Sequence, residues 1–265
     1  MIILEKHEKT PVRAAIFDFD GTLSTLRCGW EKVMAPLMTE YILGANTERK
    51  EEVKSLVDRY IDESTGIQTV LQMKWLNETI KEYGLNPGAP DDQWFYKDEY
   101  NRRLMLDVAR KRNEVESGVT PKSNYIICGS ERFLETLRDK GVTLFAASGT
   151  DDADVKRESA ALGFYDYFTE ISGAKPRAED CSKDAVIKRL ISEGGYEGGE
   201  LLVVGDGKVE IMLGRAAGAV TLGLATDEVK RSGLNPVKEK RLRAAGAHAI
   251  TGDFTHLDNI MNWLF

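Results

Sequence analysis

Apolar residues recur at helical spacing through most of the first half of the chain. Each of four segments carries one such stripe, and together they predict amphipathic helices at residues 30–41, 53–61, 67–83 and 96–108. A Pro- and Gly-rich break at residues 86–90 separates the last two. The pattern therefore predicts an all-helical segment over residues 26–120.

Short, continuous apolar runs replace the helical stripes on both sides of this segment. They predict strands at residues 14–17, 143–147, 201–204 and 219–223, with a helix at 131–140 capped by Ser130. Strands that alternate with helices favour a parallel sheet. We expect an α/β protein with a doubly wound parallel sheet, formed by residues 1–25 and 121–265, into which the helical domain 26–120 is inserted.

Composition narrows the class of protein. With 265 residues, 42% of them hydrophobic, the chain can bury a sizeable core. A net charge of −7 argues against nucleic acid or an acidic membrane as the main partner, because no basic surplus is available to neutralise phosphates. The one basic run, residues 238–243, is interpreted as a solvated helix face.

The cysteines and the apolar runs bear on location. The three cysteines, Cys28, Cys128 and Cys181, lack the spacing of a disulfide framework or a zinc site. The first residues have too short an apolar run for a signal peptide, and no later run is long enough to span a bilayer. We expect a cytoplasmic protein; the sequence does not indicate an oligomeric state.

Two carboxylates follow the first predicted strand. Asp18 and Asp20 are one residue apart, so they would share a face if the strand continued, and Gly21 then lets the backbone turn. Two close carboxylates are costly unless a metal neutralises them or one holds a proton. The pair predicts a cation site, with a solvated acidic turn as the alternative.

Two further strand ends carry polar groups, where open parallel sheets bind their ligands. Ser148 and Gly149 follow one strand and offer an O–H and an N–H to an anion such as phosphate, although this tripeptide with Thr150 is also an ordinary turn. Asp206 follows another strand and Glu210 lies one short turn later, and such oxygen ligands suit Mg²⁺.

These segments resemble the motifs of the haloacid dehalogenase (HAD) superfamily. Asp18, Asp20 and Thr22 match its first motif, Ser148 its second, and Asp206 with Glu210 its fourth, where Asp is commoner than Glu. The resemblance implies a lysine near a helix start before the fourth motif. Lys183, at the start of a predicted helix, is favoured over Lys175, which precedes a proline.

The resemblance implies roles for these residues. Asp18 is the nucleophile, Asp20 the acid and base, and Lys183 offsets charge beside the phosphate ligands Ser148 and Gly149. Mg²⁺ is held by the Asp18 carboxylate, the Asp20 backbone carbonyl and Asp206, with Glu210 in contact through water. Asp20 favours phosphate esters, because family members that cleave carbon–halogen bonds lack this second acid.

The inserted segment resembles the type 1 helical cap of the same superfamily. Arg27, Gln68 and Gln72 are its candidate substrate-binding residues, with ordinary solvent-facing side chains as the alternative. A cap implies a small phosphorylated metabolite, with a sugar phosphate as one candidate. The leading hypothesis is a magnesium-dependent phosphatase; a sugar phosphomutase and a catalytically degenerate phosphometabolite-binding regulator are the alternatives.

Overall fold

The structure is a computed structural model that describes residues 1–6, 10–179 and 182–265, so Cys181 lies outside the described residues. It divides the chain into two compact units. The first combines residues 1–28 with 112–265, and the second consists of residues 29–111.

The first unit is built on a seven-stranded sheet with the order β1-β7-β6-β5-β2-β3-β4. Its strands are β1 (Ile2–Ile3), β2 (Ala14–Phe17), β3 (Thr143–Asp151), β4 (Glu170–Ala174), β5 (Leu201–Gly205), β6 (Val220–Leu224) and β7 (Ala249–Thr251). Among these strands of the described residues, β1 pairs antiparallel with β7, and the other pairings are parallel. The central strands β2 and β5 are buried along their whole length, as expected for strands covered on both faces. The predicted α/β class is confirmed.

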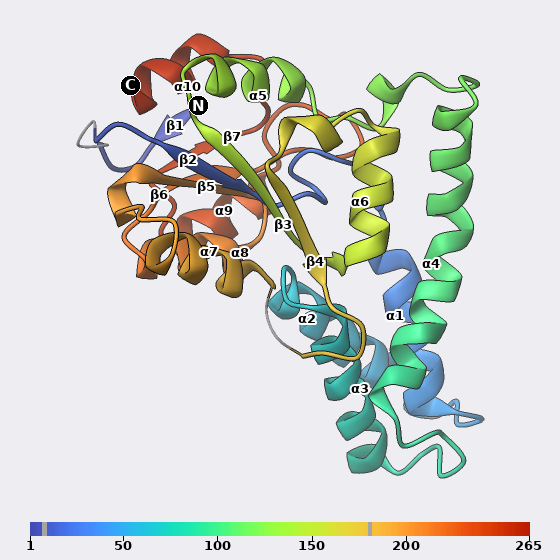
Figure 1. The fold of residues 1–265 in the computed structure, drawn as a ribbon. Coiled ribbons are helices and arrows are strands. Elements are labelled where there is room, and N and C mark those ends of the chain that lie inside the picture. The colour runs from blue at the N-terminus through green and yellow to red at the C-terminus, as the bar shows by residue number, and fades with distance from the viewer. Residues whose placement is uncertain (7–9, 180–181) are drawn as a thin grey trace. The chain divides into compact units, whose positions relative to one another are not determined.

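Helices cover both faces of this sheet. They are α5 (Ser130–Asp139), α6 (Asp152–Ala161), α7 (Ser182–Ser192), α8 (Lys208–Ala216), α9 (Pro236–Ala244) and α10 (Leu257–Leu264). Figure 1 shows α7, α8 and α9 along one face and α5 and α10 along the other. In the residues that the structure describes, no helix is both long and apolar enough to cross a membrane.

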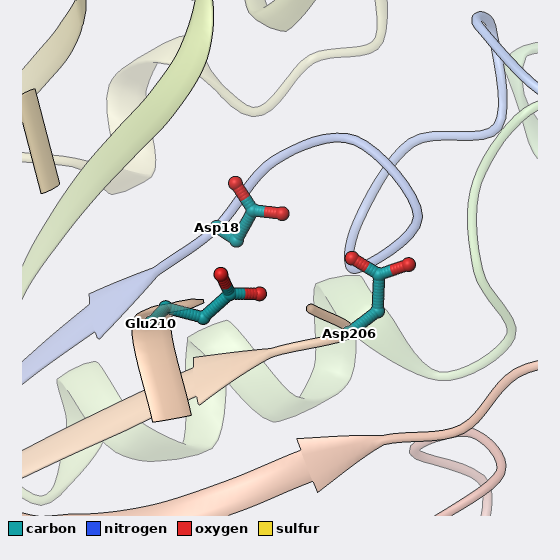
Figure 2. A group of neighbouring side chains, drawn as sticks. All are labelled: Asp18, Asp206 and Glu210. Atoms are coloured by element: carbon teal, nitrogen blue, oxygen red, sulfur yellow. The ribbon is translucent and has the colours of Figure 1, made fainter. Parts of the chain in front are cut away.

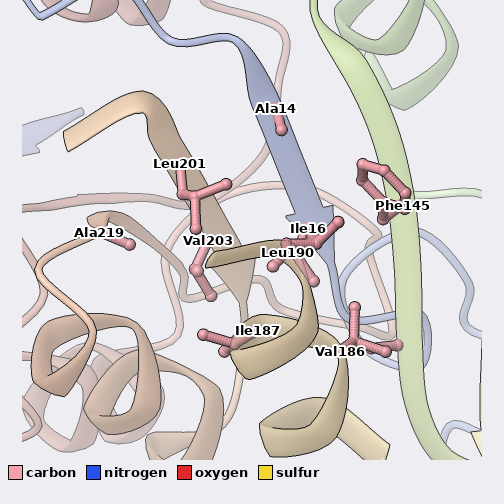
Figure 3. Close-up of a cluster of buried hydrophobic side chains, with 10 residues drawn as sticks. Ala14, Ile16, Phe145, Val186, Ile187, Leu190, Leu201, Val203 and Ala219 are labelled. Atoms are coloured by element: carbon pink, nitrogen blue, oxygen red, sulfur yellow. The ribbon is translucent and has the colours of Figure 1, made fainter. Parts of the chain in front are cut away.

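The alternation of side chains along β2 explains how both faces are filled. Ala14 and Ile16 belong to a buried cluster with residues of α7, among them Val186 (Figure 3). Phe17 points to the opposite face, where its ring meets that of Phe133 on α5 with centroids 5.9 Å apart. The next residue, Asp18, therefore returns to the face covered by α7.

Two local predictions for this unit are wrong. Ser130 does not cap its helix: it is the first residue of α5, and its hydroxyl donates to the carbonyl of Ile127 at 2.7 Å. The strand predicted to end at Ala147 runs on to Asp151, with a register shift against β4 between those two residues. Ser148 and Gly149 thus lie within β3 rather than in a turn after it.

The second unit consists of helices and their connections. Its helices are α1 (Glu31–Leu43), α2 (Lys50–Ser64), α3 (Thr69–Tyr83) and the first part of α4 (Gln93–Glu116), which continues past residue 111. The apolar stripes seen in the sequence form their buried faces; Val53, Val57 and Ile61 of α2 are examples. Between α2 and α3, the rings of Tyr60 and Trp75 stack with centroids 3.7 Å apart.

Candidate active site

Two neighbouring strands bring the acidic motifs together. Strands β2 and β5 run parallel with Phe17 opposite Val204, and the Asp18 N–H donates to the Val204 carbonyl at 2.9 Å. Asp18 and Asp206 therefore leave the same edge of the sheet. Glu210 lies in the first turn of α8, and ligand oxygens of all three acids lie within 4.8 Å of one another (Figure 2). Such a cluster of carboxylate oxygens has the chemistry of a Mg²⁺ site.

Gly21 is required where the loop after β2 passes Asp206. Its φ of +74° lies in the left-handed region. A Cβ built on it would overlap the Asp206 carboxylate, lying 2.7 Å from the Asp206 Cγ. The glycine thus lets the chain turn and leaves room for the acid beside it.

Lys183 supplies a positive charge beside Asp18 and Glu210. Its Nζ lies 3.0 Å from Asp18 Oδ1 and 2.9 Å from Glu210 Oε2, and the residue is only 5% exposed. It reaches Asp18 from the first turn of α7, the helix that covers the Asp18 face of β2. Lys175, the competing candidate, is exposed.

The charges of the cluster are unbalanced. Burial raises the pKa of Asp18 well above its usual range; Lys183 counteracts this, while the carboxylates of Glu210, Asp206 and Asp20 add to it. Burial lowers the pKa of Lys183, but Asp18 and Glu210 outweigh it and hold the net pKa above its ordinary value. The three acids of the cluster outnumber the two lysines that contact them, Lys183 and Lys238, so these oxygen donors fit a divalent cation.

Glu210 already has a partner for each oxygen. Its Oε1 accepts the Gly207 N–H at 2.5 Å, which caps the start of α8, and its Oε2 accepts Lys183. Both bonds hold the carboxylate beside Lys183. Each oxygen keeps a second lone pair, so these bonds orient Glu210 without using up its capacity to accept.

Asp20 faces β3 and is held there. The Thr150 hydroxyl donates to Asp20 Oδ2 at 2.8 Å, and the Ser148 hydroxyl lies 3.4 Å from the same oxygen. Ser148 is buried, and its hydroxyl also accepts the Thr150 N–H at 3.0 Å. Sequence reasoning missed Thr150, although its spacing of two from Ser148 along an extended β3 places both on one side of the strand.

Arg27 lies in a buried ion pair of the first unit. Its Nε and Nη2 donate to Glu158 on α6 at 3.1 and 2.6 Å, while its Nε is 3.9 Å from Asp20 Oδ1. Burial raises the pKa of Glu158 to about 7 against the opposing effect of Arg27. The other two candidate substrate residues belong to the second unit, where both are buried; the Gln72 side chain donates to Ser64 at 3.0 Å, and Gln68 precedes α3.

Lys238 was interpreted as part of a solvated helix face, and this is wrong. It is 8% exposed, and its Nζ donates to Asp206 Oδ2 and to Glu228 Oε1, both at 2.6 Å. Nothing in the local sequence distinguishes it from its charged neighbours, such as the exposed Lys240. Asp206, a motif residue, thus has a lysine partner from a distant part of the chain.

A comparison with known proteins identifies the family of this chain. A family model described as haloacid dehalogenase-like hydrolase matches residues 12–218. A phosphoglycolate phosphatase of Haemophilus influenzae is 32% identical over 91 residues, which is 34% of this chain and 41% of that protein. The match thus spans less than half the length of this curated relative.

Solved structures share the fold at low identity. A predicted phosphoglycolate phosphatase from Haemophilus somnus has a TM-score of 0.63 at 15% identity, covering 94% of this chain and 98% of that one. The β-phosphoglucomutase of Clostridium difficile has a TM-score of 0.63 at 15% identity, covering 96% and 97%. These similarities show that the α/β architecture is shared.

Proposed function

Because the chain belongs to the haloacid dehalogenase-like hydrolases, we propose that it is a magnesium-dependent phosphatase that hydrolyses a small phosphorylated metabolite through an aspartyl-phosphate. The observation that carries the proposal is the environment of Asp18. A buried carboxylate at a strand end has Lys183 at 3.0 Å and two further acids within reach of one cation. A carboxylate nucleophile, a fixed ammonium group and a metal site together suit phosphoryl transfer.

In the proposed first step, an oxygen of Asp18 attacks phosphorus in line with the ester oxygen. The bond to the ester oxygen breaks, and Asp20 gives that oxygen a proton, so the product leaves as an alcohol. In the second step, Asp20 takes a proton from water, whose oxygen attacks the phosphorus. The acyl phosphate bond breaks, and Asp18 is restored as inorganic phosphate leaves.

The remaining residues bind and orient the phosphoryl group. The Ser148 hydroxyl and the Gly149 N–H are the proposed donors to its oxygens, and Lys183 neutralises charge beside Asp18. Mg²⁺ would be held by the Asp18 carboxylate, the Asp20 backbone carbonyl and Asp206, with Glu210 in contact through water. When bound there, it would offset the negative charge of nucleophile and substrate.

We assign residues 1–25 and 121–265 to the catalytic core and residues 26–120 to a helical cap that supplies substrate contacts. Gln68 and Gln72 are its proposed substrate-binding residues, together with Arg27 at its start. Arg27 pairs with Glu158 and lies 3.9 Å from Asp20, so it would bind a substrate next to the proposed acid and base. The absence of disulfide or zinc spacing favours a reducing, cytoplasmic setting.

A sugar phosphomutase is the second candidate, because it would use the same nucleophile and the fold is shared with a β-phosphoglucomutase. A degenerate regulator that only binds a phosphometabolite is disfavoured, since Asp18, Lys183 and Asp206 retain the types and contacts that catalysis needs.

The test is a panel of phosphorylated metabolites with Mg²⁺, including phosphoglycolate and sugar phosphates, read by release of inorganic phosphate. We expect at least one substrate to release phosphate in a Mg²⁺-dependent manner, and Asp18→Asn to abolish this while remaining folded. Isomer formation without phosphate release would identify a mutase. Tight ligand binding without turnover of any compound would favour the regulator.

A further inference from the structure

Lys238 is fixed at the start of α9 by the local sequence. The Asn235 side chain accepts the N–H groups of Val237 and Lys238 at 3.0 and 3.2 Å, and Pro236 is the first helical residue. This capped start determines where the Lys238 side chain leaves the helix. The side chain is only 10% exposed, so its charge is largely removed from water.

The ammonium group of Lys238 lies between two carboxylates. Asp206 Oδ2 and Glu228 Oε1 are each 2.6 Å from the Nζ, and the two acids are 14% and 19% exposed. Burial lowers the pKa of Lys238, but these two carboxylates outweigh that effect and hold it above its ordinary value. Lys238 is therefore a cation bridging Asp206 to Glu228.

The two buried lysines divide the acids of the site between them. Lys183 contacts Asp18 and Glu210, whereas Lys238 contacts Asp206. Asp206 is also one of the three acids whose oxygens converge as a candidate metal site. A divalent cation bound there would have to share the Asp206 carboxylate with an ammonium group already in contact with it.

We propose that Lys238 is a built-in counter-ion of Asp206 that weakens cation binding at the acidic site, and that Glu228 limits this effect by drawing the ammonium group toward itself. The proposal rests on the assignment of Asp206 as a metal ligand under the proposed function. Without metal, Lys238 stabilises the acid. When a metal ion is bound, the positive charge of Lys238 repels it and lowers the affinity of the site for the ion.

The direction of this effect separates it from a purely structural role. Damage to a metal site weakens binding, whereas removal of a competing cation strengthens it. Lys238→Met should therefore tighten Mg²⁺ binding by about tenfold, since a unit charge at this range in a partly buried site is only partly screened. Glu228→Gln should weaken it, because the ammonium group then has Asp206 as its main carboxylate partner.

The experiment is calorimetric titration of the 265-residue chain with MgCl₂, together with thermal unfolding in the presence and absence of the ion. Lys240→Met is the matched control, because it removes the same charge from an exposed position of the same helix. Lys238→Arg keeps the charge and should stay close to wild type. Without Mg²⁺, Lys238→Met should unfold at a lower temperature than wild type, and added Mg²⁺ should raise its midpoint by more than it raises that of wild type.

If wild type binds Mg²⁺ and Asp206→Asn does not, but Lys238→Met binds the ion no more tightly than wild type, the counter-ion role is overturned. The proposed function is not affected by that result. Wild-type protein that binds no Mg²⁺, or binds it equally well after Asp206→Asn, would overturn both. If Lys238→Met does not fold, Lys238→Gln decides, because its amide can still donate to the two acids without a charge: tighter Mg²⁺ binding supports the proposal, and unchanged or weaker binding overturns it.

Discussion

Replacement of Gly21 by alanine tests whether the position of Asp206 matters for activity. Alanine at a φ of +74° costs about 1–2 kcal/mol of folding free energy, because its Cβ crowds the backbone in the left-handed region. The new Cβ would also lie 2.7 Å from Asp206 Cγ. Carbon atoms pack at about 3.5–4.0 Å, so the carboxylate or the loop must move by roughly 1 Å.

A displacement of this size in an active site lowers turnover by about 100-fold, which corresponds to about 2.7 kcal/mol of transition-state stabilisation. Gly141→Ala is the matched control. Its φ is +80°, but no heavy atom lies within 4 Å of the added Cβ, so it bears the backbone cost alone. Urea unfolding should show a loss of about 1–2 kcal/mol in Gly141→Ala and a larger loss in Gly21→Ala, which adds the overlap with Asp206 to the same backbone cost. The values of kcat/KM and the Mg²⁺ affinity should fall only in Gly21→Ala. Turnover in Gly21→Ala within about twofold of Gly141→Ala would refute the reasoning.

Three further predictions follow from single contacts. Lys183→Met leaves buried acids without their cation, so it should lower the free energy of unfolding by about 3 kcal/mol in urea titrations and abolish turnover in activity assays. The exposed control Lys188→Met should change the free energy of unfolding by no more than about 0.5 kcal/mol and leave turnover unchanged. Thr150→Val removes the hydroxyl on Asp20 and should lower kcat about tenfold with Mg²⁺ affinity unchanged; an unaltered kcat would exclude a positioning role. The pKa of Glu158 is raised from 4.5 to about 7, so protonated Glu158 stabilises the fold fully below pH 4.5, and this stabilisation is lost as the pH rises through 7. The free energy of unfolding should fall by up to about 3 kcal/mol over this pH range in wild type and not in Glu158→Gln.

The acidic cluster could be predicted because short segments of the sequence are enough to place its acids at strand ends. Asp18 and Asp206 each follow a continuous apolar run, and the carboxyl ends of parallel strands meet at one edge of a sheet. No knowledge of tertiary packing was needed to expect these two acids close together.

Lys183 was expected from the resemblance, but other groups around the acids were missed, since their positions depend on tertiary packing. Lys238 reaches Asp206 from a helix that begins 30 residues later, and in the sequence it belongs to a basic run like that of any solvated helix face. Glu158 is a charged residue within a short helix, and only its pairing with Arg27, 131 residues away, explains its burial. Thr150 was within reach of sequence reasoning, but β3 was ended four residues too early.

The central claim is that Asp18 becomes covalently phosphorylated during turnover. The most direct measurement is peptide mass analysis after acid quenching of the protein during turnover of a substrate found by the metabolite panel. We predict one phosphoryl group on the peptide that contains Asp18 in wild type and none in Asp18→Asn. Undiminished phosphate release by Asp18→Asn, or a phosphoryl group carried by another residue, would contradict the account.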